Sequence, residues 1–104
     1  MRTVTDADFA TEVLSADRPA LVEFTAKWCG PCRRLAPVLE QVAEEYADRL
    51  DVVALDVDTN PEAVSRCAVL STPTLLFEDG EPVRSLTGAL PKRRLLRALA
   101  LTAP

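Results

Sequence analysis

The sequence predicts an α/β protein built as a three-layer α/β/α sandwich, with a central mixed sheet of about five strands flanked by about four helices. Apolar, β-branched segments alternate with segments whose apolar residues recur at helical spacing. One strand–helix–strand segment is long enough for a parallel crossover, and a later Asp-Gly dipeptide indicates an antiparallel hairpin. The 104 residues contain no linker or internal repeat, so we expect a single domain, residues 1–104.

The parallel crossover occupies the first half of the chain. Residues 19–26, PALVEFTA, form a compact apolar run that is typical of a buried strand. From Cys32 onward, one face of a long helix is apolar and carries Leu35, Leu39, Val42, Ala43 and Tyr46. A second apolar strand follows at residues 51–58. A strand, a helix and a strand in this order make a right-handed parallel crossover.

Shorter elements complete the sandwich. They are, in chain order, a helix in residues 3–14, a helix in residues 60–69, two strands in residues 73–88 and an amphipathic helix in residues 90–101. Thr5 or Asp6 is the predicted N-cap of the first of these helices, and Asn60 is the predicted N-cap of the second. The turn between the two strands is predicted at Asp79-Gly80.

Composition and charge exclude several classes of function. Apolar residues make up 48% and charged residues 27%, which is typical of a folded soluble domain. The net charge of −4 argues against nucleic-acid binding across the domain, and we interpret the basic residues 92–94 as a solvated helix face. The polar N-terminal segment and the short apolar runs predict neither a signal peptide nor a membrane span. We therefore expect a cytoplasmic protein and, from its size and charge, a monomer.

The cysteines limit the kinds of site that the chain can form. Cys29 and Cys32 form a CxxC pair, and with no histidine and one further cysteine, Cys67, the chain is not expected to bind zinc or another metal. A structural disulfide is disfavoured, because closing so short a loop restrains the unfolded chain only weakly. Cys29 begins the long helix, where unpaired backbone N–H groups stabilise a thiolate. A redox couple is therefore the favoured interpretation, with Cys67 as a small buried apolar side chain.

A longer motif surrounds the pair. Residues 21–32, LVEFTAKWCGPC, place it between a buried strand and a helix. With the WCGPC motif, a later TPT and the glycine of LTGAL, the chain resembles the thioredoxin family over essentially its whole length. The resemblance implies the thioredoxin fold and a general protein-disulfide reductase, in which Cys29 attacks a target disulfide and Cys32 resolves the mixed disulfide. It also implies regeneration by a thioredoxin reductase, an NADPH-dependent flavoprotein, and no cofactor bound to this chain.

Two other functions remain open at this point. Disulfide oxidases and isomerases share the fold, but those relatives usually carry a histidine between the cysteines, where this chain has Gly30 and Pro31. A non-catalytic binding subunit would use the surface around Cys29 to hold one partner. Such a subunit would keep its function after both cysteines are replaced by serine.

Glu23 is an acidic residue in the middle of an apolar strand. Burial raises the pKa of a carboxyl group towards neutrality, and by resemblance Glu23 is the group that accepts the proton of Cys32. The alternative is a partly exposed Glu23 that pairs with Lys27. Most relatives have Asp at this position, and Ala54 stands where the family often carries a lysine near the carboxylate.

The resemblance also implies a substrate-binding surface that comprises Trp28, Gly30, Pro31, Thr72, Pro73 and Gly88. A cis proline faces the CxxC pair in this family, so we expect a cis peptide bond before Pro73, which leaves the Thr72 backbone free to bind an extended substrate. Thr72 replaces a residue that is often aliphatic, which predicts a more polar contact. Trp28 fits either a core position or a surface position in target contact.

Overall fold

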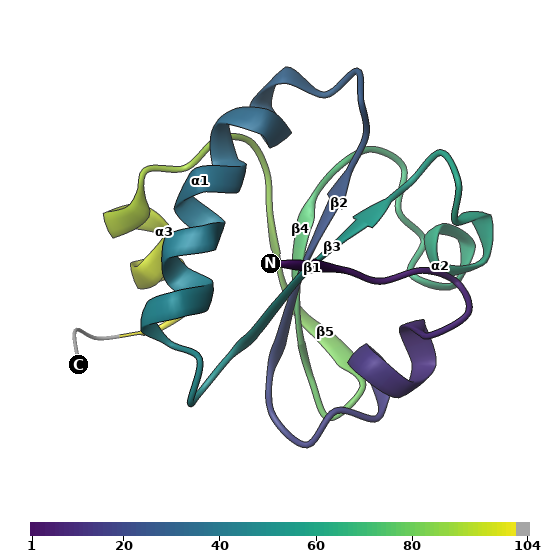
Figure 1. Ribbon diagram of the computed structural model, residues 1–104, viewed down its shortest axis with the longest axis horizontal. Helices are drawn as coiled ribbons and strands as arrows, with labels where there is room; N and C mark the ends of the chain where they lie inside the picture. Colours follow the sequence, from purple (N-terminus) through teal and green to yellow (C-terminus); the bar gives the residue numbers. More distant parts are fainter. Residues whose placement is uncertain (102–104) are drawn as a thin grey trace.

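A five-stranded sheet lies at the centre of the computed structural model, which describes residues 1–101 (Figure 1). The strands are β1 (Arg2–Thr3), β2 (Ala20–Thr25), β3 (Asp51–Asp56), β4 (Thr74–Glu78) and β5 (Glu81–Leu86). The helices are the π-helical segment η1 (Ala10–Leu14), α1 (Gly30–Glu45), α2 (Pro61–Arg66) and α3 (Lys92–Ala98). Within the described residues, no helix is both long and apolar enough to cross a membrane.

The central strand of the sheet is β2, in the order β1-β3-β2-β4-β5. β1 and β2 both pair with β3 in parallel, whereas β4 pairs with β2 and with β5 in antiparallel orientation. In Figure 1, α1 and α3 cover one side of the sheet, and α2 lies on the other side with η1. The predicted three-layer sandwich, with its parallel crossover and its hairpin, is therefore confirmed for the described part of the chain.

Alternate side chains of β2 belong to two cores on opposite faces of the sheet. Leu21 packs in the core beneath α1 and α3, whose members include Leu35, Leu39, Tyr46 and Leu95. Val22 and Phe24 pack in the core beneath η1 and α2, whose members include Phe9, Val13 and Ala63. Because side chains alternate along a strand, Glu23 lies on the same face as Leu21. The one acidic residue of β2 thus faces α1, the helix that carries the CxxC pair.

Asp6 caps a different helix from the one expected. Its carboxylate accepts hydrogen bonds from the backbone N–H groups of Glu62 (3.1 Å) and Ala63 (2.9 Å), at the start of α2. The side chain of Asn60, the predicted cap of α2, instead accepts from the Asp6 N–H and donates to the carbonyl oxygen of Asp56. Asn60 is the N-cap residue of α2, as predicted, although its side chain makes no capping hydrogen bond. The prediction of Thr5 or Asp6 as the cap of the first helix was wrong, because η1 begins after Phe9 and the Asp6 carboxylate reaches N–H groups on a distant segment.

The β4–β5 hairpin turns at Asp79 and Gly80, as predicted. Both residues have positive φ angles, 52° and 80°, which is the combination that a type I′ turn requires. A Cβ atom at Gly80 would lie 2.9 Å from the backbone carbonyl oxygen of Leu14 at the end of η1. Backbone conformation and close packing therefore both require glycine at this position.

Candidate active site

The CxxC pair lies where the chain leaves β2 and enters α1. Cys29 is the N-cap of α1, and its Sγ atom accepts a hydrogen bond of 3.2 Å from the backbone N–H of Cys32. Pro31 lies in the first turn, where it has no N–H group to leave unsatisfied. The two cysteines form a disulfide and pack against Ala26 and Val57, and each is only 5% exposed. The positive end of the α1 dipole therefore lies at the sulfur of Cys29.

The loop before β4 brings a hydroxyl group to this disulfide. The Oγ1 atom of Thr72 is 3.2 Å from the Sγ atom of Cys29. A disulfide sulfur carries no hydrogen, so the hydroxyl group is the donor. The carbonyl oxygen of Pro73 accepts a hydrogen bond of 3.0 Å from the N–H of Phe24, which ties the loop to the end of β2.

The peptide bond before Pro73 is trans, since the described residues contain no cis peptide bond. The expected cis bond was therefore wrong. A trans bond before proline is favoured by about 0.5–1 kcal/mol. The trans bond also coexists with the hydrogen bond from Phe24 to Pro73 and with the contact between Thr72 and Cys29.

Glu23 is buried, with 3% of its surface exposed. Its neighbours in the sheet are Ala54 on β3 and Thr74 on β4, so the alanine in place of the family's lysine lies beside the carboxyl group. Within the described residues, Oε2 of Glu23 has no hydrogen-bond partner and no ion pair joins Glu23 to Lys27, so the exposed alternative was wrong. Burial raises the pKa of Glu23 from 4.5 to about 7.

A cleft of about 180 Å³ joins these groups. The residues predicted from the sequence that line it are Glu23, Cys29, Pro31, Cys32, Thr72 and Gly88. Trp28, Gly30 and Pro73 are not among its lining residues. Sequence reasoning missed Leu35, Ser71, Thr74 and Thr87. Thr74 belongs to the TPT motif and Thr87 belongs to the LTGAL motif, where it precedes Gly88. These two residues could therefore have been predicted from the motifs.

Three further residues of the predicted surface differ in their surroundings. Trp28 is 62% exposed and therefore a surface residue, and its indole Nε1 donates a hydrogen bond of 3.0 Å to Oδ2 of Asp58. Gly88 has a φ angle of 85°, and a Cβ atom there would have open space around it. At Gly30 the nearest atom to a Cβ would be in the Arg34 side chain, at 3.6 Å, so packing within the chain does not require glycine at this position.

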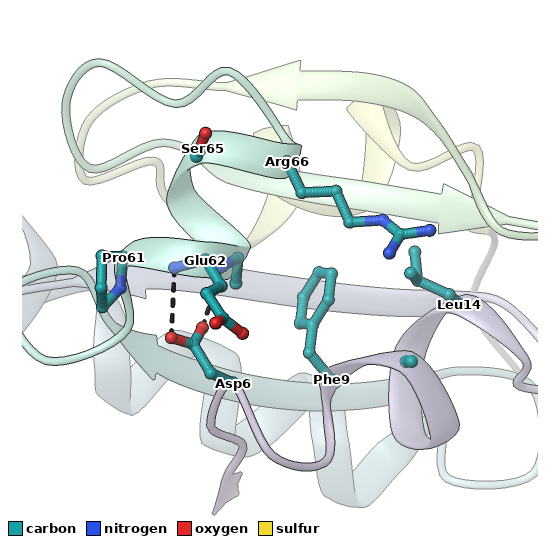
Figure 2. A pocket seen from close by; sticks show the side chains of 9 residues that line it. Asp6, Phe9, Leu14, Pro61, Glu62, Ser65 and Arg66 are labelled. Atoms are coloured by element: carbon teal, nitrogen blue, oxygen red, sulfur yellow. Dashed lines mark hydrogen bonds between the residues drawn. The ribbon is translucent and has the colours of Figure 1, made fainter.

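A larger hollow, of about 500 Å³, lies between η1 and α2 (Figure 2). Figure 2 shows Phe9, Leu14 and Arg66 around it, and the Asp6 carboxylate turned towards the start of α2. None of the predicted site residues lines this hollow.

Cys67, the C-cap residue of α2, has no disulfide partner. It is half-buried against the core beneath η1 and α2, rather than fully buried as predicted. Burial raises the pKa of its thiol.

The fold and the site together define a thiol–disulfide oxidoreductase, because a disulfide at a helix N-terminus shares one cleft with a buried carboxyl group. The family model described as Thioredoxin matches residues 1–100. The chain therefore belongs to the thioredoxin family and has the thioredoxin fold. Cys29 and Cys32 are its redox pair.

Its relatives agree with this assignment. The thioredoxin of Mycobacterium tuberculosis (strain ATCC 25618 / H37Rv) is 56% identical over 102 residues, which cover 97% of this chain and 88% of that protein. The thioredoxin of Alicyclobacillus acidocaldarius is 50% identical over 94% of this chain and 93% of its own length. The bifunctional thioredoxin reductase/thioredoxin of Mycobacterium leprae is 51% identical over 97% of this chain and 22% of its own length. The chain is thus a thioredoxin-type disulfide reductase with a CxxC active site.

Proposed function

We propose that Cys29 is the attacking thiol, Cys32 the resolving thiol, and Glu23 the group that takes up and returns the proton of Cys32. The Cys29 thiolate attacks a target disulfide, forms a mixed disulfide with one target sulfur and releases the other as a thiolate. Cys32 then transfers its proton to Glu23, attacks the Sγ atom of Cys29 and releases the second target sulfur. Two electrons pass to the target, and the dithiol of the chain becomes the disulfide.

The observation that carries this proposal is the single cleft that Cys29, Cys32 and Glu23 line together. Cys29 is the N-cap of α1 and its sulfur receives a backbone N–H, which favours negative charge there over Cys32. Glu23 has a pKa of about 7, so at neutral pH it accepts or returns a proton with little free-energy cost. Its Oε2 atom, which has no partner within the described residues, is available for that proton.

Targets dock around the pair in this proposal. Trp28, largely exposed, is oriented by Asp58 and offers an apolar surface beside Cys29. Gly30, Pro31, Pro73 and Gly88 form the rest of this docking surface. They carry no long side chains that would obstruct an approach to the sulfur. A target segment lies against Thr72, which lines the cleft beside Cys29. Residues 1–104 act as one domain and as a monomer.

The proposed electron donor is a thioredoxin reductase, an NADPH-dependent flavoprotein. The Mycobacterium leprae relative carries thioredoxin reductase and thioredoxin in its name as two functions of one chain, which supports a reductase as partner here. Since NADPH is a cytoplasmic reductant, we place the protein in the cytoplasm. The test is NADPH consumption when a thioredoxin reductase is mixed with the oxidised chain, with the Cys29→Ser variant as the control that supports no turnover.

Trapping experiments distinguish the attacking cysteine from the resolving cysteine. Cys32→Ser should accumulate a mixed disulfide with a peptide disulfide, because the resolving thiol is missing, whereas Cys29→Ser should form none. Mass spectrometry measures both products. Accumulation with Cys29→Ser instead would reverse the two roles, and retained function of the double variant would leave only a binding module.

Glu23→Gln tests the proton acceptor. Stopped-flow measurements should show unchanged attack by Cys29 and a release of the mixed disulfide that is slower by at least about tenfold, since a positioned general base contributes roughly 10²–10⁴ in rate. Glu44→Gln removes an exposed carboxylate from α1 and is the matched control. Equal release rates for Glu23→Gln and the parent chain would remove Glu23 from the mechanism.

A further inference from the structure

Acidic and basic residues are distributed unevenly along the chain. All 16 acidic residues lie within residues 1–81, whereas residues 82–104 contain no acidic residue and five of the 12 basic ones. In the described part of the chain, this basic segment forms most of β5 and the whole of α3. The five basic residues are Arg84, Lys92, Arg93, Arg94 and Arg97. One end of the chain is therefore positively charged, although the net charge of the whole is −4.

Most of these basic side chains have no acidic partner within the chain. Lys92 forms an ion pair of 2.7 Å with the Oε2 atom of Glu45 on α1. The other four are arginines with exposed side chains, and none of them forms an ion pair within residues 1–101. A guanidinium group keeps its charge throughout the physiological pH range. Four positive charges are therefore available to a partner.

A hollow of about 510 Å³ lies against α3 and the turn that follows it. Two of the arginines, Arg93 and Arg97, line it from positions one helical turn apart. Its other lining residues are apolar: Leu96, Ala100 and Leu101. Leu96 and Leu101 also pack against the core beneath α1 and α3. The hollow thus places two guanidinium groups beside an apolar surface at the edge of that core.

The turn after α3 fixes the position of this apolar surface. The N–H of Leu101 donates a hydrogen bond of 2.8 Å to the carbonyl oxygen of Leu96, and the N–H of Ala100 donates to that of Arg97 at 3.1 Å. Ala100 has a φ angle of 57°, so the three residues complete a Schellman motif. The motif brings Leu101 back towards Leu96. The sequence predicted a solvated basic face at residues 92–94, and the turn adds an apolar surface next to it.

We propose that this hollow binds a short acidic segment of a partner protein, in which an apolar side chain lies between two carboxylates. The planar guanidinium groups of Arg93 and Arg97 match carboxylates in bidentate geometry. The apolar side chain of the segment packs against Leu96 and Leu101. The carboxylates are thus complementary to the charge of the hollow, and the apolar side chain is complementary to its wall.

The charge on the rest of the surface favours a short segment over a long polyanion. The protein measures only 35 × 31 × 20 Å, and its 16 acidic residues all lie outside the basic segment. Charges interact over about 8–10 Å at physiological ionic strength. A membrane surface or a nucleic acid extends beyond the four arginines, so it would also meet these carboxylates. A segment of a few residues stays within the basic surface and avoids that repulsion.

The hollow is separate from the active-site cleft. No residue lines both of them, and neither Cys29 nor Cys32 lines the hollow. Gly88 lines the cleft, and α3 begins at Lys92, shortly after it in the chain. The two sites can therefore be occupied together, which suits a partner whose acidic segment is distinct from its disulfide.

The test uses the oxidised full chain and a labelled peptide of glutamates with one central leucine, and fluorescence anisotropy measures binding. Arg93→Gln/Arg97→Gln should bind the peptide about tenfold more weakly, because both ion pairs are lost. The matched control Arg34→Gln/Arg66→Gln removes the same charge from exposed positions on α1 and α2. It should stay within about threefold of the parent chain. A peptide with serine in place of the leucine should also bind about tenfold more weakly.

Several outcomes would overturn the proposal. Equal binding by the parent chain and Arg93→Gln/Arg97→Gln would place the peptide elsewhere, and so would a loss of binding in Trp28→Ala. Equal binding of the leucine and serine peptides would exclude the apolar contact. If phosphatidylserine vesicles or single-stranded DNA bound as tightly as the peptide, and lost binding in the same double variant, the partner would be another kind of polyanion. Self-association of the parent chain that the double variant abolishes would assign the hollow to a second copy.

Discussion

The replacement Glu23→Gln should make the stability of the oxidised protein almost independent of pH around neutrality. Glu23 is buried, and its pKa is raised by that burial from 4.5 to about 7. The difference is about 2.5 pH units, and each unit corresponds to 1.36 kcal/mol, so ionisation of this carboxyl group costs the folded state about 3 kcal/mol.

The sign of the effect follows from the direction of the pKa change. Below pH 4.5 the group is protonated in both states and has no effect. Between pH 4.5 and about 7 the unfolded chain releases the proton while the folded chain keeps it, so the stability of the folded state falls as pH rises. Above about pH 7 both states are ionised and the whole cost is present.

Urea unfolding of the oxidised proteins, from about pH 5 to about pH 8.5, measures this difference. The disulfide form is used because Cys29 and Cys32 do not titrate in it. Glu23→Gln should gain about 2.5 kcal/mol relative to the parent chain between the two ends of this range, because part of the cost is already present at the acidic end. The cost of burying the new amide does not depend on pH, so it cancels in that comparison. The stability of the control Glu44→Gln should depend on pH as that of the parent chain does. If the free energies of unfolding of Glu23→Gln and of the parent chain changed with pH in parallel, the conclusion that Glu23 is buried and unpaired would be refuted.

Other features of the fold make three further predictions. Asp6→Ala should destabilise the protein by roughly 1 kcal/mol, because α2 loses its capping carboxylate, and urea unfolding measures the loss. Asp58→Ala should increase acrylamide quenching of Trp28, which is the one tryptophan of the chain, because its indole loses a hydrogen bond. Gly80→Ala should cost about 1–2 kcal/mol or more in thermal unfolding, because φ is positive there and the new Cβ meets the carbonyl oxygen of Leu14.

Matched variants isolate each of these effects. Asp17→Ala removes an exposed carboxylate that caps no helix, and a loss of stability equal to that of Asp6→Ala would contradict the capping role. Quenching of Asp58→Ala that equals the parent value would show that the indole is held by other contacts. Gly30→Ala places its Cβ without a close contact in the chain, so a cost as large as that of Gly80→Ala would point away from the turn geometry.

Local patterns predicted much of the architecture. The β2–α1–β3 crossover and the turn at Asp79-Gly80 follow from apolar runs and turn residues that act over a few positions. The burial of Glu23 followed from its place in an apolar strand. Its orientation towards α1 follows from alternation once the two cores are assigned to the faces of the sheet. These features are determined by residues that are close together in the sequence, so they could be predicted from it.

Contacts between distant segments were beyond such patterns. Thr5 or Asp6 was predicted to cap the helix that follows them in the sequence, yet the Asp6 carboxylate reaches α2. The hydroxyl group of Thr72 reaches Cys29 only because β4 pairs with β2. The exposure of Trp28 was left open because its size alone suits a core or a surface position. Its partner Asp58 lies in the turn that follows β3.

The central position of β2 has a consequence for how the protein is made. During synthesis the CxxC helix emerges early, but β4, which flanks β2 on its other side, comes from much later in the chain. Until β4 docks, Glu23 remains open to water and Cys29 lacks the hydroxyl group of Thr72. A nascent chain therefore displays its cysteines before their environment is assembled. Thr72 and β4 complete the surroundings of the couple only when the C-terminal half of the chain has folded.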